Sequence, residues 1–149
     1  AVFGPGSALG TGDVEPFLGT GGDVAPWDLT DAIDRGDVPR ALDCLSRMLD
    51  AGGRHPLAVM ASLHGHFGRL LRLDGSGIHD EASASDVLGI KGFPAKKALR
   101  ASRSLGPHKT ARSIRLLAGA DLDLRGRSAW PPELVVEVLV ARLASLTRR

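Results

Sequence analysis

From about residue 27 onward, apolar side chains recur every three or four positions, with polar side chains between them. This period is typical of helices that bury one face, and no segment shows the strict alternation of a half-buried strand. The pattern therefore predicts an all-α bundle of about five to seven helices. The expected helices cover residues 29–35, 38–51, 56–73, 86–88, 93–104, 108–125 and 133–146.

Polar residues and glycines near the helix ends support these boundaries. Asp28, Asp37 and either Ser83 or Ser85 are the expected N-caps, because their side chains can accept hydrogen bonds from backbone N–H groups of the first turn. Gly36 is expected to end the first helix. We therefore expect short helices joined by tight turns.

The same period predicts which side chains are buried. On 56–73 they are Leu57, Met60, Ala61, Leu63, Phe67, Leu70 and Leu71; on 93–104, Ala95, Ala98, Leu99 and Ser102; on 108–125, Ala111, Ile114, Leu117 and Ala118; and on the last helix, Leu134, Val135, Val138, Leu139, Ala141 and Leu143. The turn Leu105-Gly106-Pro107 is expected to separate the two helices that flank it.

The N-terminal segment lacks this period. Residues 1–12 and 19–26 are rich in Gly, Ser and Pro, with room for one short helical turn at 13–18. Such composition is typical of flexible linkers. We therefore expect residues 1–22 to be a linker and residues 23–149 to form one helical domain.

The charge is distributed unevenly along the chain. Residues 1–52 hold nine acidic and three basic side chains, whereas residues 91–149 hold thirteen basic and four acidic ones. The overall balance is only +2. This polarity indicates that the C-terminal half contacts something anionic, or that the two halves contact each other or acidic neighbours.

The sequence contains no catalytic or cofactor-binding motif. His64 and His66 lie about 200° apart on a helix, so they cannot bind one metal ion from the same face. Cys44, the only cysteine, lies on an apolar helix face, which favours a buried structural thiol. Asp121 and Asp123 have arginine neighbours, which favours salt bridges. We therefore predict no metal, no cofactor and no reaction catalysed by this chain alone.

The expected location is the cytoplasm. No apolar run approaches the roughly 20 residues of a membrane span. The first residues lack the basic and apolar regions of a signal peptide. A single cysteine cannot form an internal disulfide, which fits a reducing compartment. No membrane partner is expected.

Two basic stripes stand out in the C-terminal half. They consist of Lys96, Arg100 and Arg103 on the first helix, with Lys97 to one side, and of His108, Arg112 and Arg115 on the next. Such stripes either contact phosphates or remain a solvated polar surface, and the sequence favours neither. The two helices resemble a helix-turn-helix in outline, but the second lacks Asn or Gln for reading bases. A stand-alone helical nucleic-acid-binding domain is therefore one hypothesis.

Trp130 is a further DNA-contact candidate. It follows Arg125 and Arg127 in a loop, where an indole ring can stack on an unpaired base. An indole in such a loop more often packs on the core or on a partner. We favour the packing role.

Several segments, taken in order, resemble the C-terminal collar domain of bacterial DNA polymerase III delta subunits. They are WDLTDAI at 27–33 followed by RGD at 35–37, HFGRLLRL at 66–73, LG at 88–89 followed by Phe93 and KKAL at 96–99, and LLAGADLDLRG at 116–126. The last segment is the most similar, with Arg125 where the family often has lysine. The resemblance covers roughly residues 13–149.

This resemblance implies a role in the clamp loader of DNA replication. The collar packs beside the collars of the gamma or tau subunits and of delta prime, and primer-template DNA passes through the chamber below. Residues 1–22 would be the tail of the lid domain and its connector. The family's contact with the sliding clamp belongs to an N-terminal domain that this sequence does not contain. The chain would then be part of the polymerase holoenzyme and would itself catalyse no reaction.

The last helix is the expected subunit interface, because its apolar positions spread beyond one narrow stripe. Burying a Leu or Val side chain contributes about 1.5–3 kcal/mol, so such a helix can supply both a core and an interface. The interface candidates are Leu134, Val135, Val138 and Leu139, with Arg142 at the rim.

Overall fold

The computed structural model describes residues 24–74 and 77–148, and all regular structure within these ranges is helical. The all-α prediction is therefore confirmed, with six α-helices in this part of the chain. The predicted linker at 1–22 lies outside the described residues. The elements are α1 (Pro26–Asp34), α2 (Val38–Leu49), α3 (Pro56–Leu73), α4 (Glu81–Leu88), α5 (Phe93–Leu122), the short π-helix η3 (Asp123–Arg127) and α6 (Pro132–Thr147).

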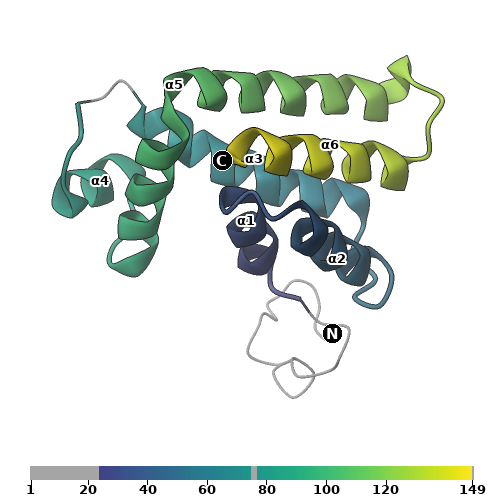
Figure 1. The fold of residues 1–149 in the computed structure, drawn as a ribbon, viewed down its shortest axis with the longest axis horizontal. Helices are drawn as coiled ribbons and strands as arrows, with labels where there is room; N and C mark the ends of the chain where they lie inside the picture. The colour runs from purple at the N-terminus through teal and green to yellow at the C-terminus, as the bar shows by residue number, and fades with distance from the viewer. Residues whose placement is uncertain (1–23, 75–76, 149) are drawn as a thin grey trace.

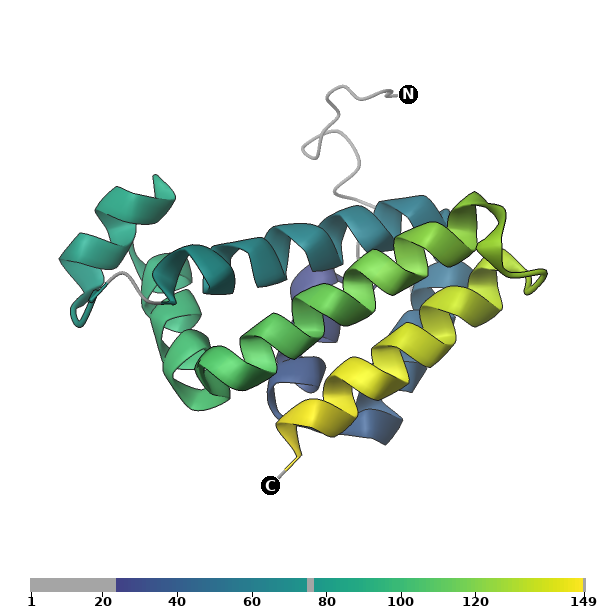
Figure 2. The same cartoon turned by 90° about the horizontal axis from the view of Figure 1, so that it is seen from above.

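The helices form one bundle with a smaller lobe at one end. Helices α3 and α6 and the second half of α5 run side by side, with α1 and α2 packed across them (Figures 1 and 2). The main core joins α1, α2, α3, α5 and α6. Helix α4 packs on the first half of α5 over a separate small core of Leu73, Ala84, Leu88, Ala98 and Leu99.

Helix α5 consists of two arms that meet at Gly106. This glycine has φ 80° and ψ 165°, a backbone conformation outside the helical region, and Pro107 follows it. The hydroxyl of Thr110 donates to the carbonyl of Gly106 at 2.8 Å. The first arm consequently runs in a different direction from the second (Figure 1). The predicted turn between two helices is confirmed.

The start of α4 differs from the prediction. The helix begins at Glu81 rather than near Asp86, and its N-cap is Asp80, whose carboxylate accepts the backbone N–H of Ser83 at 2.9 Å. Neither Ser83 nor Ser85 is the cap. Similarly, α1 begins at Pro26, and Asp28 lies in its first turn, where its carboxylate accepts the N–H of Ala25. The predicted cap Asp37 of α2 is confirmed, with Arg40 N 3.0 Å from Asp37 Oδ1.

Some apolar positions predicted to be buried are exposed. Leu57 and Leu71 are 60% and 46% exposed, because at 100° per residue they lie on a different side of α3 from the buried Leu70. Ala61 and Ala118 are also exposed. Val59 and Leu73 of α3 are buried instead, although the sequence pattern did not select them.

Helix α6 is buried on more sides than a single apolar stripe would cover. It packs against α1, α2, α3 and α5, so several of its sides are covered. Its buried side chains include Val136, Val140 and Ala144, which the sequence pattern did not select. Val135 and Leu139 also lie in the core, whereas Leu134 is exposed and Val138 is half-buried.

The end of α6 rests on the turn between α1 and α2. Gly36 in this turn has φ 72°, and a Cβ atom added there would lie 2.7 Å from the Cα of Arg148. The hydroxyl of Thr147 donates to the carbonyl of Ile33 in the last turn of α1. The glycine is therefore required twice, by its backbone conformation and by the approach of another backbone.

Candidate functional site

The described residues offer no metal site, since no three His, Cys, Asp or Glu side chains among them group around one point. His64 Nε2 lies 2.8 Å from Asp121 Oδ2, and His66 Nε2 lies 2.8 Å from Asp34 Oδ1. Each histidine therefore joins α3 to a different helix. In the same ranges, no helix combines the length and the apolar character that crossing a membrane requires.

Cys44 is buried, as predicted, with 1% of its surface exposed. Burial raises the pKa of its thiol, although the nearby Arg40 opposes the shift. Because the thiolate is the reactive form, we expect the native chain at pH 8 to react far more slowly with a chromogenic disulfide reagent than the chain unfolded in urea. Equal reaction rates in the two states would show that this thiol is accessible.

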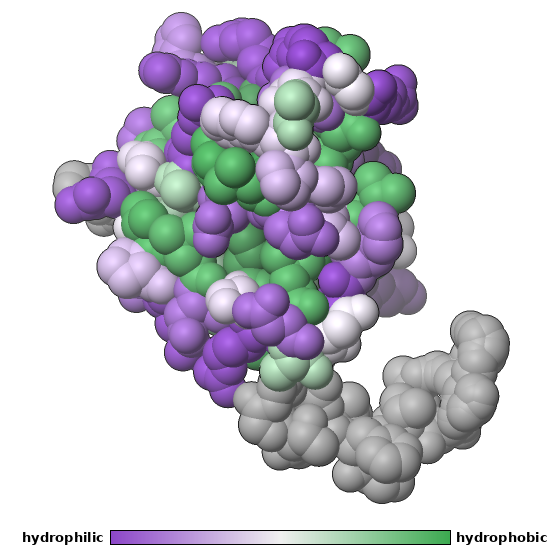
Figure 3. Space-filling model, turned by 90° about the vertical axis from the view of Figure 1, so that its right-hand side faces the viewer, coloured by the Kyte–Doolittle hydropathy of each residue, from purple (hydrophilic) through white to green (hydrophobic). Residues whose placement is uncertain are grey.

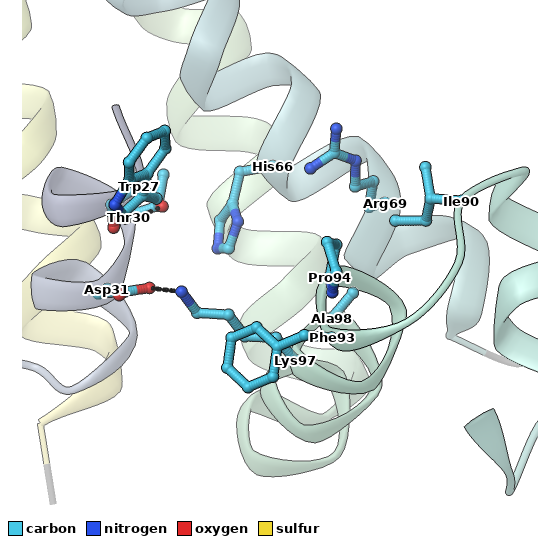
Figure 4. Close-up of a pocket in the computed structure, with 10 residues that line it drawn as sticks. All are labelled: Trp27, Thr30, Asp31, His66, Arg69, Ile90, Phe93, Pro94, Lys97 and Ala98. Carbon is cyan, nitrogen blue, oxygen red and sulfur yellow. Dashed lines mark hydrogen bonds and ion pairs between the residues drawn. The ribbon is translucent and has the colours of Figure 1, made fainter. Parts of the chain in front are cut away.

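A cleft opens between α1, α3 and the first arm of α5 and encloses about 510 Å³. Trp27 and Phe93 stand on two sides of it and are 63% and 65% exposed, with His66 and Arg69 from α3 behind them (Figure 4). We call this the aromatic cleft. Its lining residues are Trp27, Thr30, Asp31, His66, Arg69, Ile90, Phe93, Pro94, Lys97 and Ala98.

Charges inside the aromatic cleft are largely paired. Lys97 Nζ lies 2.6 Å from Asp31 Oδ1 and 5.8 Å from the centre of the Phe93 ring (Figure 4). The predicted DNA contact Lys97 is thus bound to α1. Arg69, at the back of the cleft, makes no ion pair with any residue that the structure describes.

The sequence pattern did not identify the two exposed aromatic residues, although it contained a signal. Trp27 precedes the buried Leu29 by two positions, and Phe93 precedes the buried Ala95 by two. Two positions correspond to about 200° around a helix, so each ring points away from the buried face. Each also lies beside a proline at the start of its helix.

The basic stripe on the first arm of α5 lies as predicted. Lys96, Arg100 and Arg103 are exposed, opposite a buried face that contains Ala95, Ala98, Leu99 and Ser102. Arg103 donates to the backbone carbonyl of His79, so its guanidinium is bound to the segment before α4. Lys96 and Arg100 have no acidic partner within the described ranges.

The second basic stripe is also exposed but does not continue the first. His108, Arg112 and Arg115 lie on the second arm, beyond the kink at Gly106. The two arms run in different directions (Figure 1), so the two stripes do not follow one straight helix axis. The structure therefore offers no single basic track along α5.

A shallow groove of about 100 Å³ lies between the second arm of α5 and α6. It brings together two predicted DNA contacts, Arg115 and Trp130, and four predicted interface residues, Val135, Val138, Leu139 and Arg142. We call it the α5–α6 groove. Its lining residues are Arg115, Leu116, Gly119, Ala120, Asp123, Arg127, Trp130, Val135, Val138, Leu139 and Arg142.

Asp123 in this groove is paired, whereas Arg115 and Arg142 have no acidic partner among the residues that the structure describes. Arg127 Nε lies 2.8 Å from Asp123 Oδ1, and a second nitrogen of Arg127 donates to the carbonyl of Gly119 at 3.0 Å. This hydrogen bond to Asp123 raises the pKa of the Arg127 guanidinium. The predicted salt bridge of Asp123 is confirmed, whereas Asp121 pairs with His64 instead of an arginine.

The starts of α3 and α6 and the end of α5 lie at one end of the bundle (Figure 1), and large apolar side chains of these segments are exposed. We call this the end patch. Figure 3, which faces this end, shows hydrophobic side chains surrounded by polar ones. The large residues of the end patch are Leu57, Leu122, Trp130 and Leu134.

The aromatic cleft, the α5–α6 groove and the end patch are the candidate binding surfaces that we consider among the described residues. Comparison of the chain with protein families, with curated proteins and with solved structures finds no match.

Proposed function

We propose that this chain is a non-catalytic assembly domain, the helical collar of a DNA polymerase III delta subunit. The observation that carries the proposal is the presence of two separate exposed apolar surfaces, the aromatic cleft and the end patch. A subunit within a ring of unlike neighbours needs two different contact surfaces, one for each neighbour. The order of the family-like segments along the chain supports the same reading.

The chemistry of these surfaces favours protein partners. Large exposed aromatic residues such as Trp27, Phe93 and Trp130 are typical anchors of protein–protein interfaces. Apolar patches rimmed by polar residues are uncommon on monomers without a partner. The proposed partners are the gamma or tau subunits and delta prime, with primer-template DNA in the chamber that the assembly encloses.

A stand-alone nucleic-acid-binding domain is the second candidate. Lys96, Arg100 and Arg112 favour it, because they are exposed and have no acidic partner in the described part of the chain. Two observations weigh against it. Lys97 is paired with Asp31, and the kink at Gly106 separates the two basic stripes.

Charge reversal at Arg100 and Arg112 distinguishes the two candidates. We expect the unmodified chain to bind primer-template DNA weakly when alone and to be retained by immobilised clamp-loader subunits. The double variant R100E/R112E should lose the residual DNA binding, measured by fluorescence anisotropy, and keep its retention by the subunits. The exposed Arg40 of α2 supplies a control, since R40E should change neither.

Tight DNA binding by the chain alone would contradict the assembly proposal if it fell steeply with rising salt and no loader subunit retained the chain. In that case, a charge-reversal variant should lower the slope of log binding constant against log salt concentration by about one for each phosphate contact that it removes. Such a decrease would identify the basic stripes as the binding surface.

A further inference from the structure

The α5–α6 groove combines an apolar floor with an arginine on each side. Val138 is half-buried there, and Gly119 and Ala120 leave the floor shallow. Arg115 projects from α5 and Arg142 from α6, and both are exposed without an acidic partner in the ranges that the structure covers. The groove is therefore cationic on both sides and apolar between them.

The positions on α6 define the length of this surface. Leu134, Val138 and Arg142 are spaced by four residues, so they form one stripe along the helix. Eight residues of helix correspond to roughly 12 Å, which is a little more than two helical turns. Trp130 lies at the end of the groove where α6 begins. The surface therefore matches a short helical segment with anchors three or four residues apart.

We infer that the α5–α6 groove binds an acidic amphipathic helix of a neighbouring clamp-loader subunit. Apolar side chains of that helix cover Val138 in the groove and Leu134, which lies about one turn earlier on α6, and its carboxylates pair with Arg115 and Arg142. An arginine and a carboxylate form strong, geometrically specific pairs when both are placed at an interface. This inference rests on the proposed function, and it names the chemistry of one partner surface.

The groove itself favours a protein helix over a nucleic acid. A phosphate backbone needs cations but gains nothing from an apolar floor such as Val138 and Ala120. Asp123 also lies in the groove, and its carboxylate uses the charge of Arg127, so only two of the three arginines remain to bind an anion. An acidic helix uses the apolar floor and both remaining arginines.

The test measures binding of the chain to the gamma or tau subunits and delta prime, with three variants and one control. R115E and R142E should each weaken binding about tenfold, which is the effect of losing one charged pair at an interface. Val138→Asp should weaken it at least as much. R112E is the matched control, since Arg112 is exposed on the same arm of α5 but does not line the groove, and it should bind as the unmodified chain does.

Two further readouts separate binding from folding. Neither Arg115 nor Arg142 takes part in a hydrogen bond or ion pair that holds the described fold, so R115E and R142E should melt at the temperature of the unmodified chain. The double variant R115E/R142E should also lose most of the salt dependence of subunit binding, whereas R115K/R142K should keep it because the charges remain.

The outcomes distinguish the groove from the wider proposal. If the unmodified chain binds the subunits and R115E, R142E and R112E bind equally well, the groove inference is wrong and the assembly function stands. If the unmodified chain binds none of the subunits, both are wrong. Loss of self-association, or of DNA binding alone, in R115E/R142E would assign the groove to a second copy or to a nucleic acid and overturn the inference.

Discussion

Phe67→Ala is expected to lower the free energy of unfolding by about 3–5 kcal/mol. Phe67 on α3 is fully buried in the main core, so its removal leaves a cavity as well as losing apolar burial. For a domain of this size, whose total stability is about 5–15 kcal/mol, such a loss is a large fraction. Urea denaturation followed by circular dichroism measures it as a shift of the midpoint.

The exposed Phe93 provides a control of the same residue type. Phe93→Ala removes the same atoms from a side chain that is 65% exposed, so we expect a change within about 0.5 kcal/mol. The comparison isolates burial from side-chain chemistry. Equal losses in the two variants would contradict the arrangement of α3 in the core and of Phe93 at the mouth of the aromatic cleft.

Gly36→Ala is expected to destabilise the chain by more than about 2 kcal/mol. A left-handed conformation costs an L-residue about 1–2 kcal/mol, and at Gly36 the new Cβ would also lie 2.7 Å from the backbone of Arg148. The end of α6 would have to move away from the turn between α1 and α2. Thermal or urea unfolding measures the loss.

Gly53→Ala separates the two contributions to this loss. Gly53 has φ 62°, close to the 72° of Gly36, but no atom lies within 4 Å of the position of its Cβ. Only the cost of the backbone conformation, about 1–2 kcal/mol, is therefore expected. If the two variants lost the same stability, the end of α6 would not rest against the α1–α2 turn.

Much of the fold was predictable because its signals are local. The three- and four-residue period predicted most of the helices, and Gly106 with Pro107 predicted the break in α5. The start of α4 was not predictable in the same way. Its first turn is built from short polar residues, and the helix depends on the Asp80 cap and on packing over Ala84 and Leu88.

The composition of the candidate surfaces depended on contacts between distant parts of the chain. The exposed positions of Lys96, Arg100 and Arg112 followed from helical geometry, as did the buried face opposite Lys96. The pairing of Lys97 with Asp31 joins helices 66 positions apart in the sequence and has no local signal. Such contacts require the tertiary structure.

Contacts between helices also decide which residues of α6 are buried. The sequence pattern of this one helix assigned its apolar residues to an interface. The neighbouring helices decide that Val135 and Leu139 are core residues and leave Leu134 and Val138 at the surface. They also place Trp130 and Arg115 beside Val138 in one groove. Two separate predictions, a DNA contact and a subunit contact, therefore meet at one surface.

The most direct test of the assembly role is sedimentation velocity of the 149-residue chain, alone and mixed with the gamma or tau subunits and delta prime. We predict that the folded chain, checked by circular dichroism, moves into a single faster-sedimenting species together with those subunits. A folded chain that sediments at the same rate with and without the subunits would contradict the account.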